Sequence, residues 1–262
     1  MSKVSKRQQA ILDLIGEQGF VATDTLVRRF GVTPQTIRRD LNALSESHRI
    51  ARFHGGAGGP SLHTPYRDRR QSGVAAKRSI ADATAKLIPD GASLFINIGT
   101  TTEAVAEALL DHRDLFVITN NLNVARTLSA NESFTIKLSG GEVRHHDGGL
   151  VGSEAVDFID GHRADFGIIG ISAVDVDGSL LEFDAREARP ARAIVRNSAR
   201  VILVTEHHKF GRRATNRMGS LRELDTVVTD SAVGGVFPQL LEDGGVELIV
   251  ASSGKASASK GS

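Results

Sequence analysis

The sequence predicts an α/β protein in two parts, a small helical part that ends in a β-hairpin and a larger part in which strands and helices alternate. Short amphipathic helical patterns separated by a glycine turn lie near the start of the chain, and short apolar runs alternate with helical patterns after residue 90. Charge is divided in the same way, because residues 1–70 hold 12 Lys+Arg and 6 Asp+Glu whereas the remainder holds 20 and 25. A basic module joined to a mildly acidic domain is typical of a protein that binds a polyanion with one part only.

Composition excludes several classes of protein. A chain of 262 residues is long enough for one or two domains with a buried core. We expect it to be soluble and cytoplasmic, because its start lacks a secretory apolar segment and no apolar run approaches the roughly 20 residues of a membrane span. There is no Cys, and the nine His are scattered without the spacing of metal ligands. We therefore expect neither a metal nor a cofactor.

The first two helices are predicted from apolar spacing and from their stop signals. Residues 6–17 form the first helical pattern, with Gly19 beyond its end. Residues 24–30 form the second, with Thr23 as the expected cap and Gly31 as the terminator. A third helix begins only three residues after Gly31, so the pair is predicted to be a helix-turn-helix.

The third helix, over residues 33–44, carries the chemistry of a recognition helix. Thr33 can cap it and Pro34 suits its first turn, where a missing N–H costs nothing. Ile37, Leu41 and Leu44 share one face. Exposed positions carry the candidate DNA contacts Thr33, Gln35, Thr36, Arg38, Arg39 and Asn42. Arginine can bond guanine at two points, and Gln or Asn can do the same to adenine; the alternative is a solvated amphipathic helix.

After the third helix, residues 50–57 alternate and then break at paired glycines, as the β-hairpin of a winged helix-turn-helix does. Arg52 and His54 on this wing are expected to contact phosphate or the minor groove. For His54, the alternative is a loop histidine whose ring is satisfied by backbone groups.

The larger part alternates strands and helices in the manner of a mostly parallel, covered sheet. Strands are predicted over residues 93–98, 115–119, 134–138, 166–171, 201–205, 226–228 and 246–250. Helices are predicted over 75–88, 103–110 and 187–198, and Pro190 is expected to delay the start of the last one. The expected divisions are a DNA-binding domain (1–58), a linker (59–72), an α/β domain (73–251) and a disordered, low-complexity tail (252–262).

Ligands of such sheets bind beyond the carboxyl ends of strands. The candidate phosphate site is the turn of Gly99, Thr100, Thr101 and Thr102 before a helix, although a Gly-Thr turn can also cap a helix without any ligand. Later junctions contribute Asn120, Gly140, Gly141 and Glu142, which offer amide donors, close backbone approach and a hydroxyl acceptor for a small phosphorylated polyol. Asp175, Asp177 and Glu182 are either turn formers or hydroxyl acceptors. No Walker A or GxGxxG pattern is present, so a nucleotide is not expected.

The run TPQTIRRDL at 33–41, followed by HGGA at 54–57, resembles the N-terminal signature of DeoR-type transcriptional repressors. The runs at 95–101, 119–125 and 177–184 extend this resemblance toward the members of that family that control glycerol metabolism. The resemblance implies a repressor that binds double-stranded operator DNA, forms a homo-oligomer (dimer or tetramer) and is released by a small phosphorylated effector. Glycerol-3-phosphate is the first expectation, and another sugar phosphate is the alternative.

The effector domain of that family is similar in fold to ribose-5-phosphate isomerase, which raises an enzyme as the second alternative. Matched to this sequence, the two carboxylate positions of that isomerase fall on Ile169 and Ser172, so the general base is absent and we expect no enzyme. The same resemblance implies a phosphate contact for Lys209, although His208 stands where a serine is usual. The alternative for Lys209 is a surface lysine with no role.

Overall fold

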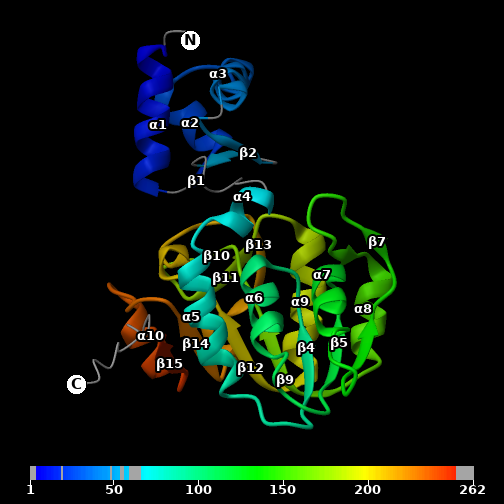
Figure 1. Ribbon diagram of the computed structural model, residues 1–262. Coiled ribbons are helices and arrows are strands. Elements are labelled where there is room, and N and C mark those ends of the chain that lie inside the picture. The colour runs from blue at the N-terminus through cyan, green and yellow to red at the C-terminus, as the bar shows by residue number, and fades with distance from the viewer. Residues whose placement is uncertain (1–3, 19, 48, 54–55, 59–65, 252–262) are drawn as a thin grey trace, which may run out of the picture.

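The computed structural model describes residues 4–18, 20–47, 49–53, 56–58 and 66–251. Figure 1 follows the chain from its first helices in blue to its last strand in red. No helix in these ranges is both long and apolar enough to cross a membrane. Three predictions, the helix stop at Gly19, the wing contact of His54 and the disordered tail at 252–262, lie outside the described residues.

The N-terminal part consists of helices packed on a small antiparallel sheet. The helices are α1 (Lys6–Gln18), α2 (Thr23–Phe30) and α3 (Pro34–Glu46), and the strands in sheet order are β1 (Phe20–Ala22), β3 (Gly56–Gly58) and β2 (Ala51–Phe53). Its core is apolar and includes Ile11, Leu14, Leu26, Ile37, Leu41 and Leu44. The predicted helix-turn-helix and hairpin are confirmed, whereas β1 was not predicted because three residues carry too little pattern.

The ends of α2 and α3 follow from local chemistry. Gly31 closes α2 in the left-handed region at φ 60°, and its N–H donates to the Val27 carbonyl at 3.0 Å. Thr33 caps α3, as predicted, by accepting a hydrogen bond from the Thr36 N–H at 3.3 Å. The predicted cap of α2 is wrong, because Thr23 lies inside that helix and the cap position is Ala22, which has no side-chain oxygen to accept a hydrogen bond.

The larger part is built on a seven-stranded sheet in the order β15-β14-β12-β9-β4-β5-β6, with every neighbouring pair parallel. The strands are β4 (Ser93–Ile96), β5 (Phe116–Thr119), β6 (Thr135–Leu138), β9 (Ala164–Ile169), β12 (Ser198–Val204), β14 (Thr226–Thr229) and β15 (Glu247–Val250). All seven predicted strands are confirmed. The chain proceeds outward from β4 in one direction and from β9 in the other, so the topological switch point lies between these two strands.

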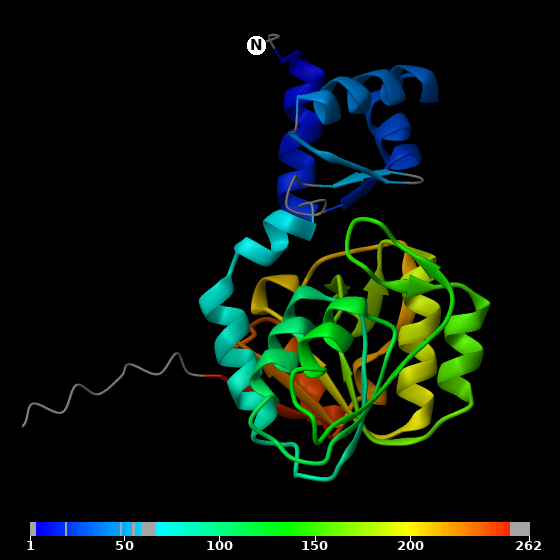
Figure 2. The same ribbon diagram turned by 45° about the vertical axis from the view of Figure 1, so that its right-hand side comes forward.

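Helices cover both faces of this sheet (Figure 2). The helices are α4 (Tyr66–Gln71), α5 (Val74–Ala85), α6 (Thr100–Ala108), α7 (Leu122–Leu128), α8 (Ser153–Asp160), α9 (Ala185–Asn197) and α10 (Phe237–Asp243). Successive side chains of a strand point to opposite faces, so Leu94 and Ile96 pack in the core under α5 to α7, whereas Phe95 packs in the core under α8 to α10.

Shorter elements lie at the rim of the sheet. A second, antiparallel sheet has the order β10 (Ala173–Val174), β11 (Ser179–Glu182) and β13 (Asn216–Ser220). A two-stranded ribbon pairs β7 (Glu142–Val143) with β8 (Leu150–Val151), and short 3-10 helices cover η2 (His207–Lys209) and η3 (Leu221–Glu223).

Two predicted helix starts are wrong. Helix α6 begins at Thr100, directly after Gly99, so the predicted loop threonines form its first turn. Helix α9 begins at Ala185, ahead of Pro190, and therefore Pro190 does not delay it. The Asp184 side chain sets that start by accepting from the Arg186 N–H at 2.9 Å, and Pro190 is tolerated inside the helix at the loss of one backbone hydrogen bond.

Candidate functional site

Helix α3 is divided into a buried and an exposed face. Ile37, Leu41 and Leu44 are buried, whereas the candidate DNA contacts Gln35, Arg38, Arg39 and Asn42 are exposed. Thr33 and Thr36 serve the cap, and their hydroxyl oxygens lie 2.9 Å apart. The split places outward the side chains that are predicted to read bases, as binding in the major groove requires.

The wing contributes one described candidate. Arg52 lies in β2 and pairs with Ala57 of β3 across the hairpin. Its backbone position agrees with the predicted wing, while His54 belongs to the short stretch outside the described residues.

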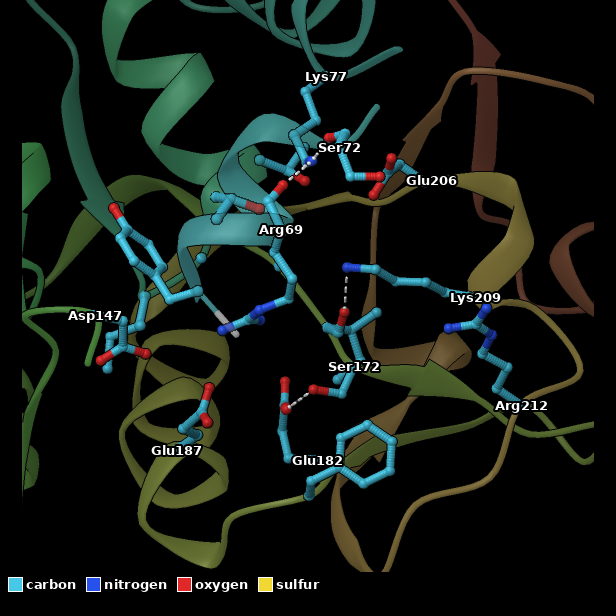
Figure 3. A pocket seen from close by; sticks show the side chains of 18 of the residues that line it. Arg69, Ser72, Lys77, Asp147, Ser172, Glu182, Glu187, Glu206, Lys209 and Arg212 are labelled. Atoms are coloured by element: carbon cyan, nitrogen blue, oxygen red, sulfur yellow. Dashed lines mark hydrogen bonds between the residues drawn. The ribbon is translucent and has the colours of Figure 1, made fainter. Parts of the chain in front are cut away.

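A cavity of about 150 Å³ opens at the switch point of the large sheet, and Figure 3 shows it from close by. Its walls come from the carboxyl ends of β4 and β9, the start of α6, the loop between β7 and β8, and the segments around α4, β11 and η2. Four of the predicted effector residues line it: Gly99, Thr100, Thr101 and Lys209. The strand order therefore brings together residues that are far apart in the chain.

The start of α6 offers an anion site within this cavity. Thr101 is 3% exposed, and its hydroxyl makes no hydrogen bond with any of the described residues. An unpaired buried hydroxyl is costly unless a ligand satisfies it. Thr102 behaves differently, because its hydroxyl bonds to the Asn97 carbonyl at 2.9 Å and the Gly99 carbonyl at 2.8 Å and so stabilises the turn itself.

Lys209 and Glu182 form the charged floor of the cavity. The Lys209 ammonium donates to the Ile171 carbonyl at 2.8 Å, and burial lowers the pKa of this ammonium to about 8. Glu182 is 4% exposed and accepts a hydrogen bond from the Ser172 hydroxyl. Burial, followed by the nearby charge of Glu187, raises the pKa of Glu182 to about 8. This carboxyl can exchange hydrogen bonds with a ligand hydroxyl in either protonation state.

Further charged residues of the cavity were not predicted. Arg69 reaches into it from α4, and Arg212 lies near Lys209 (Figure 3). By sequence, Arg69 belongs to the predicted linker (59–72) and to the basic excess of the first 70 residues. No local pattern distinguishes it from Arg67 or Arg70, because only the packing of α4 turns Arg69 toward the cavity.

The loop between β7 and β8 reaches the cavity through Asp147 rather than through a predicted residue. Arg144 is 4% exposed and pairs with both Asp147 and Glu187, the latter at 2.5 Å. It therefore ties this loop to α9, and Asp147 and Glu187 both line the cavity. The multiple carboxylates raise the pKa of the Arg144 guanidinium against the opposing effect of its burial.

Six predicted effector residues do not line the cavity: Thr102, Asn120, Gly140, Gly141, Glu142 and Asp177. These six residues lie near strand ends, as predicted, but they support the structure around the cavity instead of lining it. The Asn120 amide donates to the Leu150 carbonyl at 3.0 Å, and Gly141 lies against the Val151 carbonyl. Glu142 is exposed on β7, and Asp177 accepts from the Ser179 N–H at 2.8 Å in a turn. Strands β5 and β6 lie on one side of the switch point, so their loops meet the cavity only at its edge.

The chain is similar to known proteins along most of its length. Residues 7–61 match the family described as "DeoR-like helix-turn-helix domain", and residues 72–231 match the family described as "DeoR C terminal sensor domain". The glycerol-3-phosphate regulon repressor of Escherichia coli K12 is 51% identical over 94% of this chain and 98% of its own. The repressor of the same name from Haemophilus influenzae is 49% identical over 92% and 94% of the two chains. Among solved structures, ribose 5 phosphate isomerase A of Neisseria gonorrhoeae aligns with a TM-score of 0.39 and 13% identity, over 52% of this chain and 53% of its own.

Proposed function

The chain belongs to the DeoR family of transcriptional regulators, and we propose that it is a repressor released from operator DNA by a small phosphorylated polyol, glycerol-3-phosphate in the first place. The observation that carries this proposal is the cavity of about 150 Å³ at the switch point, which is lined by both the start of α6 and Lys209. The curated relatives are named transcriptional repressors, so the protein is not an enzyme.

Operator DNA is held in this proposal by the exposed face of α3 and by the wing. Arg39, Gln35 and Asn42 read base edges, and Arg38 and Arg52 contact phosphate or groove walls. Residues 1–58 act as the DNA-binding domain and residues 73–251 as the sensor, with 59–72 between them. We further propose a cytoplasmic homo-oligomer, because a symmetric pair of helix-turn-helix domains reads two half-sites one helical turn apart.

The effector's phosphate is held by the α6 N-terminus and Lys209. Helix N-termini present N–H groups and a partial positive charge to anions, and the Thr101 hydroxyl adds a donor that has no described partner of its own. Ser172 and Glu182, which also line the cavity, suit the hydroxyl groups of a polyol. Phosphate at one end and hydroxyls at the other are the chemical features of glycerol-3-phosphate.

Operator release tests the proposal. A labelled operator fragment bound to the full chain is titrated in parallel with glycerol-3-phosphate, ribose-5-phosphate and fructose phosphates, with glycerol as the control without phosphate. Glycerol-3-phosphate is expected to release DNA at the lowest concentration and glycerol to have no effect. The Lys209→Ala variant is expected to need at least tenfold more effector, because it loses a charge-assisted bond worth about 1.5 to 3 kcal/mol. Lys86→Ala, an exposed lysine outside the cavity lining, is the matched control.

Three outcomes would each contradict a different part of this assignment. Release by a different sugar phosphate alone would replace the effector but keep the site, provided Lys209→Ala abolishes the response. Equal sensitivity of the wild type and Lys209→Ala would remove the site itself. Conversion of any of these sugar phosphates into an isomer by pure protein would contradict the assignment as a non-enzyme.

A further inference from the structure

Helix α4 forms one wall of the proposed effector cavity. Tyr66, Arg69 and the adjoining Ser72 all line it. Only residues 59–65 separate Tyr66 from Gly58, the last residue of β3 in the DNA-binding part. Helix α4 therefore bounds the cavity and also belongs to the stretch of chain that connects the cavity to the DNA-binding part.

The start of α4 is bonded to the helix that carries the proposed phosphate site. The Tyr66 hydroxyl donates to the Glu103 carboxylate of α6 at 2.6 Å and accepts from the Asn123 amide at 2.9 Å. Asn123 also donates to Glu103 at 3.0 Å and to the Asp147 carbonyl at 2.9 Å. Partial burial and the Glu103 carboxylate raise the pKa of Tyr66, so its hydroxyl remains a donor. Tyr66 is thus linked to α6, α7 and the cavity-lining loop at once.

The end of α4 is attached separately. The buried Lys77 of α5 donates to the Arg69 carbonyl at 2.6 Å and to the Ser72 carbonyl. Gly73 then turns the chain at φ +61°, and a Cβ there would lie 2.3 Å from a carboxylate oxygen of Glu206. The positive φ favours glycine at this turn. The bonds made by Tyr66 and Lys77 hold α4 close to the cavity at both ends.

Between these attachments, the Arg69 side chain points into the cavity (Figure 3). Its guanidinium makes no hydrogen bond or ion pair of the usual length with another residue in the described part of the chain, although Lys209, Glu182 and Lys77 lie within its electrostatic reach. Burial lowers the pKa of Lys209 most and Glu206 raises it, and the positive charge of Arg69 lowers it further, so the two cations repel one another. An anion placed between them would relieve that repulsion and gain two charge-assisted partners.

We propose that Arg69 binds the anionic group of the effector opposite Lys209 and that α4 thereby transmits effector binding to the DNA-binding domain. This inference rests on the proposed function, because it concerns the same site. A guanidinium carried by α4 and an ammonium carried by η2 approach one phosphate, so the bound state selects one position of α4 relative to the large sheet. An effector shifts the equilibrium between DNA-bound and released forms only through such a difference in contacts.

Three variants separate effector binding from its transmission. Arg69→Gln removes the charge, Arg69→Lys keeps a charge without the planar fork, and Arg67→Gln removes an exposed arginine of the same helix that does not line the cavity. Calorimetry on the full, DNA-free chain with glycerol-3-phosphate gives the affinity for the effector. Arg69→Gln is expected to weaken this affinity about tenfold or more, Arg69→Lys to recover part of it, and Arg67→Gln to match the wild type.

Tyr66→Phe tests the second half of the proposal. It breaks the bond from α4 to Glu103 while leaving Arg69 in place. The quantity measured is the ratio of operator affinities without and with saturating glycerol-3-phosphate. We expect this ratio to fall severalfold in Tyr66→Phe although the calorimetric affinity of the free protein for effector changes less, because a link in the coupling is lost rather than a ligand contact.

The outcomes distinguish this inference from the function on which it rests. If Lys209→Ala loses sensitivity while Arg69→Gln binds glycerol-3-phosphate like the wild type, the role of Arg69 is refuted and the effector site stands. If Arg69→Gln binds weakly but Tyr66→Phe keeps the full ratio, Arg69 is a ligand residue and α4 is not the transmitting element. If the wild type neither binds nor responds to any sugar phosphate, the proposed function and this inference both fail. Should Arg69→Gln prove unfolded by circular dichroism, Arg69→Lys decides the matter alone.

Discussion

The carboxylate of Asp40, on the inner side of α3, accepts a hydrogen bond from Arg7 Nε of α1 at 2.5 Å. Gln8 of α1 donates to the same carboxylate at 3.3 Å. Asp40 is 8% exposed although it lies in the middle of the helix whose outer face carries the predicted DNA contacts. The contact therefore joins α3 to α1, and the bond to Asp40 raises the pKa of Arg7.

Replacing Asp40 by Asn is expected to destabilise the DNA-binding part by about 1 kcal/mol, since a partly buried ionic hydrogen bond becomes a neutral one. The measurement is urea unfolding of the full chain followed by a probe placed in α1. Glu46→Gln serves as the control, because it removes one negative charge from an exposed side chain at the end of α3. An unchanged unfolding midpoint in Asp40→Asn would show that the apolar core alone orients α3.

Arg39→Ala is expected to weaken specific operator binding by about 1 to 3 kcal/mol, because Arg39 is exposed on the face opposite Ile37, Leu41 and Leu44. Binding to unrelated DNA should fall less, since non-specific affinity depends on the overall positive charge of the protein. Gel shifts with operator and with shuffled DNA at one salt concentration give both numbers. A variant that keeps its fold and its operator affinity would place Arg39 away from the bases.

Thr101→Val and Thr102→Val form a matched pair with opposite expected effects. The Thr101 hydroxyl has no partner among the described residues, so its removal should leave the ligand-free stability equal or slightly higher while the response to effector weakens. The Thr102 hydroxyl makes two hydrogen bonds within the turn, so its removal should cost about 1 kcal/mol of stability. Melting temperatures without effector, read beside operator release with effector, test both. Destabilisation by Thr101→Val would mean that its hydroxyl has a structural partner.

Glu182→Gln should change how stability depends on pH. Burial raises the pKa of Glu182 from 4.5 to about 8, so the folded protein holds a proton that the unfolded chain releases between these values. Stability contributed by this group is therefore present below pH 4.5 and falls as the pH rises toward 8, by up to about 1.4 kcal/mol per pH unit. Burial lowers the pKa of Lys209 from 10.5 to about 8, so this group makes the free energy of unfolding rise with pH. That effect is confined to the range above pH 8.

The comparison of Glu182→Gln with the wild type isolates that slope. The free energy of unfolding of the variant minus that of the wild type should increase from about pH 4.5 to 8 and then level off. Glu132→Gln, an exposed glutamate, should show no such trend. A constant difference for Glu182→Gln across this range would indicate that Glu182 is ionised throughout.

Much of the molecule follows from signals that act over a few residues. Thr33, Pro34 and Gly31 mark helix ends by hydrogen bonds and backbone angles that involve only near neighbours, so α3 was predicted at its correct start. The apolar runs of the large sheet are equally local, and all seven strands were found. Prediction failed where a local signal was ambiguous, as at Thr23, which can stand before a helix or within it.

The composition of the cavity depended on the tertiary structure. Thr101 and Lys209 were placed at strand ends by sequence, but only the strand order, with β4 beside β9, brings their elements to one cavity. The same order leaves Gly140 and Glu142 outside it, whereas Asp147, in the next loop between β7 and β8, lines it because Arg144 ties that residue to α9. Arg69 is the clearest case of a cavity residue that the sequence does not identify. Arg67 and Arg70 lie in the same helix, and the feature that separates Arg69 from them is the direction in which α4 packs, which is set by Tyr66, Lys77 and partners far along the chain.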